Sequence, residues 1–180
     1  MILPFEKPIL TSPFGNRDMG GGRIEFHSGI DLIPAGSGLW NGINHNSMLS
    51  QIQKRLNTAI VSCLGGKVVF SDRLAGGGYT VVIDSVFSQE ELPQTIRLSY
   101  SHLQENLQVN VGDIVDENQI IGYMGYSDVV YEQTHLHFGL CYNPILDPRF
   151  CYQESSRTNP IGNVFGYTWN VQEGCNEITL

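Results

Sequence analysis

Four of the five histidines in the 180-residue sequence stand in short motifs that could hold or use a metal ion. His135 and His137 form an H-x-H motif, and His27 forms an H-x-x-x-D motif with Asp31. On a β-strand, residues i and i+2 point to the same face, so the two histidines of H-x-H would lie side by side. Imidazole is a frequent metal ligand, and zinc accepts it readily. The H-x-H motif therefore indicates either a metal site or two polar residues on a solvated sheet face.

The two motifs together are more informative than either one alone. H-x-x-x-D by itself also fits a loop histidine beside an acidic turn, because residues 28–30 do not favour a helix. Two imidazoles and one carboxylate, however, form a three-ligand set that leaves a fourth position for water, as catalytic zinc sites do. His102 and the remaining histidine of H-x-H are then available as acid–base groups. His45 has no partner nearby in the sequence, so we expect it to be solvated.

The elements that position these residues are predicted to be short strands joined by turns. Apolar runs alternate with turn residues from residue 58 onward, which is typical of an antiparallel sandwich or barrel. The expected strands cover residues 59–64, 67–70, 80–83, 96–103, 120–124 and 135–140, and a further hairpin is expected at 164–171. The predicted fold class is therefore mostly β, a compact antiparallel β sandwich or barrel-like domain.

Residues 39–58 interrupt this strand pattern. Ser47 could cap a helix whose apolar residues recur at helical spacing on one face. The residues of that face are Met48, Leu49, Ile52 and Leu56. We expect one short inserted helix here, preceded by a polar, turn-like stretch at 41–46.

The composition excludes several classes of partner. A net charge of −8 with only 10 Lys and Arg residues argues against nucleic-acid binding, which needs a basic surface. No segment approaches the ~18 apolar residues of a membrane span. The first residues lack the basic and apolar regions of a signal peptide, so we expect either a trimmed leader or release by cell lysis with a phage particle. The four cysteines show no C-x-x-C spacing, which predicts buried thiols or a single bridge. They are Cys63, Cys141, Cys151 and Cys175.

Over roughly residues 9–150 the chain resembles the lysostaphin/LytM-type peptidoglycan endopeptidases. The segment 27–31 looks like the H-x-G-x-D metal motif of that family, and 100–103 is similar to its Tyr-x-His-Leu. The segment 134–138 resembles its closing H-L-H-F. Each fragment is short, and their order along the chain carries the resemblance.

The resemblance implies a role for each candidate residue. His27, Asp31 and His137 would hold a zinc ion, Zn2+, as the cofactor. His102 and His135 would be the catalytic histidines facing the open coordination position. The family fold has a substrate groove, and its substrates are the peptide bridges of peptidoglycan. The sequence contains no H-E-x-x-H helix, so the acid–base work falls to the two catalytic histidines.

We therefore predict one zinc-dependent endopeptidase domain over residues 1–150, with the insertion at 39–58 and a C-terminal extension at 151–180 packed on the same domain. The polar stretch 41–46 would be free to line the groove and help to choose the substrate. The enzyme would act outside the cell, in the cell envelope or as part of a virion. Other envelope or phage-tail proteins are expected as further partners.

Two other functions fit part of the pattern. A mononuclear iron oxygenase uses the same two-histidine, one-carboxylate set, but the two extra imidazoles suit hydrolysis better. A non-catalytic zinc-binding module of an envelope or phage tail would keep the fold. Such a module would not need all five site residues, which are present here.

Overall fold

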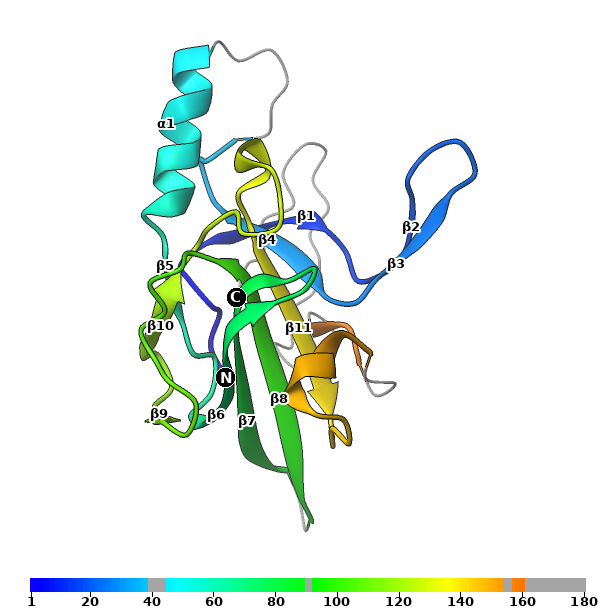
Figure 1. The fold of residues 1–180 in the computed structure, drawn as a ribbon, viewed down its shortest axis with the longest axis vertical. Helices are drawn as coiled ribbons and strands as arrows, with labels where there is room; N and C mark the ends of the chain where they lie inside the picture. Colours follow the sequence, from blue (N-terminus) through cyan, green and yellow to red (C-terminus); the bar gives the residue numbers. More distant parts are fainter. Residues whose placement is uncertain (39–44, 90–91, 154–156, 161–180) are drawn as a thin grey trace.

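The centre of the molecule is a seven-stranded sheet in which all neighbouring strands pair antiparallel (Figure 1). The computed structural model describes residues 1–38, 45–89, 92–153 and 157–160. In their order across the sheet the strands are β1 (Pro8–Ser12), β4 (Ile30–Pro34), β11 (Leu136–Tyr142), β8 (Leu92–Leu103), β7 (Gly78–Gln89), β6 (Gly66–Leu74) and β9 (Ile114–Val115). The prediction of a mostly β, antiparallel domain is confirmed.

Smaller elements surround this sheet. The strands β5 (Ala59–Val61) and β10 (Ile120–Tyr123) form a two-stranded sheet, and β2 (Gly15–Asp18) and β3 (Ile24–His27) form a hairpin that projects from the body (Figure 1). The helical elements that the structure describes in full are α1 (His45–Leu56) and two 3₁₀ turns, η1 (Tyr131–Gln133) and η2 (Pro148–Gln153). Among the described residues, no helix combines the length and hydropathy needed to cross a membrane.

Strand alternation separates a hydrophobic face of the sheet from a polar one. Along β11, Leu136 and Phe138 belong to the main core, whereas His137 between them points to the opposite face. The core residues lie against Ile60 and Ile121 of the small β5–β10 sheet. The hydrophobic effect therefore fixes the face on which His137 lies, because a one-residue slip would bury the imidazole in the core.

The central position of β11 brings distant parts of the chain together. This strand pairs with β4 on one side and with β8 on the other. The register places His137 opposite Asp31 of β4 and opposite Ser101 of β8. Side chains that face each other across antiparallel strands lie within reach of one another, so this register sets up the candidate site.

The hairpin formed by β7 and β8 is longer than the sequence pattern predicts. Both strands run for 12 residues, and they pair as far as Gln89 and Leu92. The expected strands cover only residues 80–83 and 96–103, because Glu and Pro, which occur between them, are depleted in strands. Pro93 nevertheless pairs with Ser88 near the end of the hairpin.

The predicted helix is present, but its buried face is rotated from the predicted one. It begins at His45, so Ser47 lies inside the helix and does not cap it. Ile52 and Arg55 are buried, whereas Leu49 is 40% exposed. At 100° per residue, positions 48, 52 and 55 lie within one narrow stripe and position 49 lies outside it. Residues 41–44 of the polar stretch and the hairpin expected at 164–171 lie outside the described residues.

Part of the predicted C-terminal extension is described. Cys151 is buried, and together with Tyr152 it packs against Leu74 and Val82 on the polar face of the sheet. The boundary at residue 150 and the packing of the whole extension stay predictions, because residues 154–156 and 161–180 lie outside the described part.

Candidate functional site

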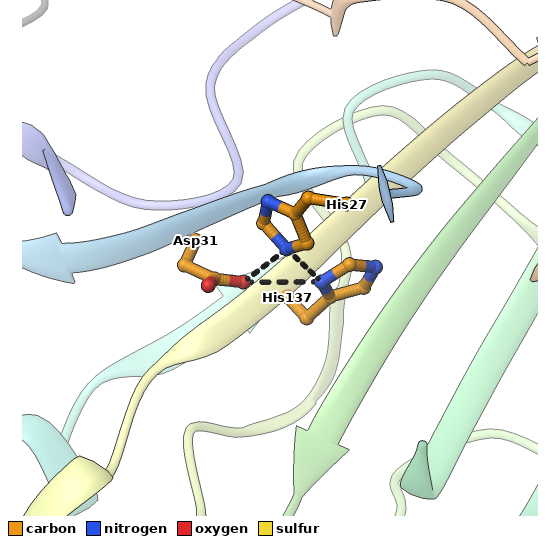
Figure 2. A group of neighbouring side chains, drawn as sticks. All are labelled: His27, Asp31 and His137. Carbon is orange, nitrogen blue, oxygen red and sulfur yellow. Dashed lines mark hydrogen bonds and ion pairs between the residues drawn. The ribbon is translucent and has the colours of Figure 1, made fainter. Parts of the chain in front are cut away.

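Three side-chain atoms converge on the polar face of the sheet (Figure 2). Oδ1 of Asp31 lies 3.0 Å from Nε2 of His27 and 3.0 Å from Nδ1 of His137. The two ring nitrogens are 2.9 Å apart. The predicted ligand residues are therefore brought together, although 106 residues separate Asp31 from His137 in the sequence.

Local backbone structure explains how the three side chains meet. His27 ends β3, Asp31 lies on β4 and His137 lies on β11. The turn between β3 and β4 passes very close to β11 at Gly29. A Cβ atom there would lie 2.4 Å from the carbonyl oxygen of Phe138 and 2.8 Å from Nε2 of His137. Only glycine therefore lets the turn approach the ligand strand this closely.

The three atoms have the chemistry of a metal-binding set. Nδ1 of His27 lies 2.7 Å from the carbonyl oxygen of Pro13, which can only accept a hydrogen bond, so this nitrogen carries the proton and Nε2 keeps its lone pair. A positive charge between them would stabilise two nitrogens and a carboxylate oxygen that face one another. A tetrahedral zinc ion would hold such atoms about 3.3 Å apart, close to the observed separations. The residues thus fit a metal ion.

The protonation states of the ligand residues also suit a metal. Burial alone would raise the pKa of Asp31, but the neighbouring imidazoles of His135, His137 and His27 outweigh it and hold that pKa well below its ordinary value. Burial lowers the pKa of His137. At neutral pH the set therefore offers an ionised carboxylate and a neutral imidazole, as metal binding requires.

The two predicted catalytic histidines lie beside this cluster. The ring centroids of His102 and His135 are 4.8 Å apart, and that of His102 is 6.0 Å from that of His137. Nε2 of His135 is 3.4 Å from Oδ1 of Asp31. All five predicted residues therefore meet in one place.

An irregularity in β8 turns His102 toward the site. Tyr100 faces the core and Ser101 the polar face, so simple alternation would point His102 back into the core. The pairing register shifts between Tyr79 and Val81, which leaves an extra residue on β8, and His102 has a left-handed φ of 61°. Such a bulge re-aims a side chain at a local conformational cost.

Main-chain carbonyls orient both catalytic candidates. Nδ1 of His102 donates to the carbonyl of Ser127 at 2.8 Å, and Nδ1 of His135 donates to that of Gln133. These bonds place the proton on Nδ1 and leave a lone pair on Nε2. Burial, aided by the neighbouring His135, lowers the pKa of His102 to about 4. His102 is therefore neutral at neutral pH and can accept a proton.

A cavity of about 540 Å³ opens over these residues. All five site residues line it, and Met19 and Phe26 of the β2–β3 hairpin form part of its wall. Its volume lies in the range of small-molecule and peptide sites. The arrangement is a set of metal-ligand atoms in an open pocket, with two carbonyl-oriented imidazoles beside it.

Three further residues at the site escaped the sequence analysis. Arg17 lies 3.5 Å from Oδ2 of Asp31 and donates to Glu25 at 2.7 Å. Tyr152 packs its ring 5.5 Å from that of His137, and Arg55 lines the pocket from the helix. No local motif marks Arg17 or Tyr152. Arg55 could have been found, because it stands three residues after Ile52 on the buried stripe.

Comparisons with known proteins place the chain in a family. Residues 45–148 match the model of peptidase family M23. This match covers more than half of the chain, and the chain belongs to peptidase family M23. The matched range includes His102, His135 and His137, whereas His27 and Asp31 lie before it. A search of curated proteins found no match.

Solved structures with the same fold include peptidases. The catalytic domain of the antimicrobial peptidase lysostaphin from Staphylococcus simulans is 23% identical, with a TM-score of 0.54 over 87% of this chain and 89% of that one. A zinc-containing peptidase from Vibrio cholerae is 21% identical, with a TM-score of 0.54 over 78% of this chain and 36% of that one. A structure of the SpoIIIAH and SpoIIQ complex matches at 18% identity, with a TM-score of 0.56 over 88% and 96% of the two chains. At these identities the likeness shows the fold.

Proposed function

We propose that the protein is a zinc-dependent endopeptidase that hydrolyses the peptide cross-links of bacterial peptidoglycan. The observation that carries the proposal is the meeting of three metal-ligand atoms and two carbonyl-oriented histidines at one open pocket. Membership of a peptidase family supports hydrolysis of a peptide bond over the iron-dependent oxidation that the same ligand types could serve.

In this proposal the zinc ligands are Nε2 of His27, Oδ1 of Asp31 and Nδ1 of His137. The likeness to a zinc-containing peptidase supports zinc as the ion. When bound, zinc acts as a Lewis acid that polarises the scissile carbonyl and lowers the pKa of a bound water toward neutrality. Arg17, 3.5 Å from Oδ2, holds the outer oxygen of Asp31 so that Oδ1 stays directed at the cluster.

His102 and His135 then perform the proton transfers. Each has its proton on Nδ1, held by a carbonyl, and a lone pair on Nε2. Nε2 of one histidine can take a proton from the attacking water, and a protonated Nε2 can return it to the leaving amine. Protonated imidazole also stabilises the negative charge that develops on the carbonyl oxygen.

The substrate is proposed from the setting of the family. The lysostaphin match is named as an antimicrobial peptidase. An enzyme that cuts wall peptides would reach its substrate outside the cytoplasm, either in the cell envelope or as part of a virion. The net charge of −8 gives no general attraction to anionic wall polymers, so recognition would rest on the groove.

A non-catalytic role is the second candidate, because the fold also occurs in a structure described as a SpoIIQ–SpoIIIAH pore-forming complex. A purely structural module has no need of two carbonyl-oriented histidines beside a metal-ligand set. The complete site therefore favours the enzyme.

The test combines metal analysis with digestion of wall fragments. Zinc-loaded protein is incubated with purified muropeptides of several cross-link types, and new amino termini are identified by mass spectrometry. We expect one zinc per chain and cleavage of at least one cross-link type. The folded Asp31→Ala variant should lose zinc and cleavage together, whereas Asp147→Ala, which removes an exposed carboxylate paired with Arg149, should lose neither.

Two results would count against the proposal. Full zinc occupancy in folded Asp31→Ala would overturn the ligand assignment. Failure of the zinc-loaded wild-type protein to cleave any cross-link type would reject the enzyme in favour of the non-catalytic module.

A further inference from the structure

The helix α1 carries a buried arginine whose guanidinium lies among main-chain carbonyls. Arg55 is only 2% exposed. Its Nη2 donates to the carbonyls of Ser37 at 3.0 Å and Gly38 at 2.6 Å. Its Nη1 donates to the carbonyl of Thr134 at 3.2 Å and, more weakly, to that of Glu132 at 3.4 Å. One side chain thus binds two segments almost 100 residues apart.

These two segments are the ones that flank the candidate site. Residues 37–38 follow β4, the strand that carries Asp31, and residues 132–134 include the end of η1 and lead directly into His135. Arginine suits such a bridge, because its rigid, planar fork presents several donors at once. A lysine at this position would offer only a point charge.

The contacts on η1 surround the carbonyl that orients His135. Arg55 binds the carbonyls of Glu132 and Thr134, and the carbonyl between them, that of Gln133, accepts the Nδ1 proton of His135. Any rotation of the turn that moved the Gln133 carbonyl would also break the bonds to Arg55. The orientation of the His135 ring is therefore coupled, through the backbone, to the position of the Arg55 guanidinium.

We propose that Arg55 is a positioning residue for His135. Arg55 fixes η1 so that the imidazole of His135 keeps its proton on Nδ1 and directs its Nε2 lone pair into the site. This role rests on the proposed function of His135. The inserted helix would then contribute to catalysis through Arg55. This contribution differs from the selection of substrate that we predict for the polar stretch 41–46. A general base works only when it is held within hydrogen-bond reach of its proton, so a small misplacement is costly.

Burial of Arg55 distinguishes this role from simple anchoring of the helix. Burial lowers the pKa of the guanidinium, which means that the surroundings disfavour its charge. Ile52, fully buried one turn earlier, already anchors the helix by the hydrophobic effect. An apolar residue at 55 would anchor the helix without that electrostatic cost.

The experiment compares Arg55→Met with a matched neighbour. Arg55→Met keeps the long stem and removes every donor. The control is Lys54→Met, because Lys54 is exposed and also ties the helix to a carbonyl, that of Ala35 at 2.6 Å, but does not reach η1. In zinc-loaded protein, ¹⁵N chemical shifts of the His135 ring report its tautomer, and steady-state kinetics on a cleaved muropeptide give kcat and KM.

For Arg55→Met we expect retained zinc, a His135 ring that no longer holds the single Nδ1–H tautomer, and a kcat lower by about 10- to 100-fold with little change in KM. Lys54→Met should match the wild type in all three. If Arg55→Met does not fold, Arg55→Lys takes its place, with the same change of tautomer and a smaller loss of kcat expected.

The outcomes separate this proposal from the function itself. An unchanged His135 tautomer and kcat in folded Arg55→Met would overturn the role of Arg55. Equal losses of kcat in Arg55→Met and Lys54→Met would also overturn it, because they would show that both residues only anchor the helix. Restoration of kcat in Arg55→Met by added guanidinium ions would support it. If the wild-type protein cleaves no muropeptide, the proposed enzymatic function is rejected. If the tautomer of His135 nevertheless changes in Arg55→Met, the positioning contact of Arg55 is still supported.

Discussion

At the level of single residues, three histidines of the site share one arrangement: each donates its Nδ1 proton to a main-chain carbonyl. The pairs are His27 with Pro13, His102 with Ser127 and His135 with Gln133. His137 differs, because its Nδ1 points into the cluster. Carbonyl partners fix the tautomer without adding charge to the site, so each Nε2 is ready to bind a metal or accept a proton.

Removal of the catalytic candidates should separate chemistry from metal binding. We expect His102→Ala and His135→Ala to keep one zinc per chain and to lose activity by about 100-fold or more, since each removes an acid–base group. His27→Ala is the contrasting variant, because it removes a ligand and should lose both. Zinc content and muropeptide cleavage are measured on the same folded samples. Loss of zinc from His102→Ala or His135→Ala would show that a ligand had been mistaken for a catalytic residue.

The sequence could single out the five residues that the structure brings together, because their motifs are local and their side chains are chemically distinctive. Their roles as ligands and catalytic groups stay predictions. It could not predict what orients them. A carbonyl partner can belong to any residue type, so Pro13, Gln133 and Ser127 leave no signal in the sequence. The left-handed backbone of His102 is equally hidden, because it arises from pairing between β7 and β8.

At the level of elements, the projecting β2–β3 hairpin forms one wall of the pocket. Phe26 is 52% exposed and lines the pocket, whereas Ile24, two residues earlier on the same strand, is 60% exposed and does not line it. The hairpin turn contains three glycines with positive φ, Gly20 to Gly22, a conformation that few other residues adopt. An exposed aromatic side chain beside a reactive centre is a natural surface for a peptide substrate.

Truncation of this aromatic side chain should weaken binding and leave chemistry intact. We expect Phe26→Ala to raise KM roughly 3- to 10-fold, the loss from a partly buried apolar contact, with kcat little changed. Ile24→Ala provides the matched control on the same hairpin and should behave as the wild type. A fall in kcat at constant KM would instead assign Phe26 to the chemical step, and equal effects of both variants would point to the hairpin fold.

Element boundaries were harder to predict than element types. The period of apolar residues indicated a helix in 39–58, and α1 is present, but the buried stripe runs through Arg55 because tertiary hydrogen bonds outweigh side-chain polarity there. The central place of β11 in the sheet was not accessible from the sequence. Its two neighbours, β4 and β8, are set by contacts between residues far apart in the chain.

At the level of the whole molecule, the two faces of the sheet have different tasks. One face builds the core with residues such as Leu98, Tyr100 and Phe138, and the other carries Ser101 and His137. Cys63 belongs to the core, and Cys151 lies in the smaller cluster on the opposite face. Cys63, Cys141 and Cys151 are all buried, and Cys175 lies outside the described residues.

The buried thiols should resist alkylation while the protein is folded. Burial raises the pKa of Cys63 to about 12 and that of Cys151 to about 11, so almost no thiolate is present at pH 8. In a Cys175→Ser background, we expect iodoacetamide to leave both residues unmodified at pH 8 and to modify both in denaturant. Peptide mapping by mass spectrometry gives the result. Rapid modification of either residue in the folded protein would contradict its burial.

The place of β11 has a consequence for synthesis on the ribosome. Strands β4 and β8 do not pair with each other, and each pairs instead with residues of β11, at 136–142. Until those residues leave the exit tunnel, the nascent chain holds two unjoined pieces of sheet with open edges and exposed apolar surface. His137 arrives with the same strand. The ligand set and the closed sheet are therefore completed in a single late step, and a half-made chain has no complete peptidase site.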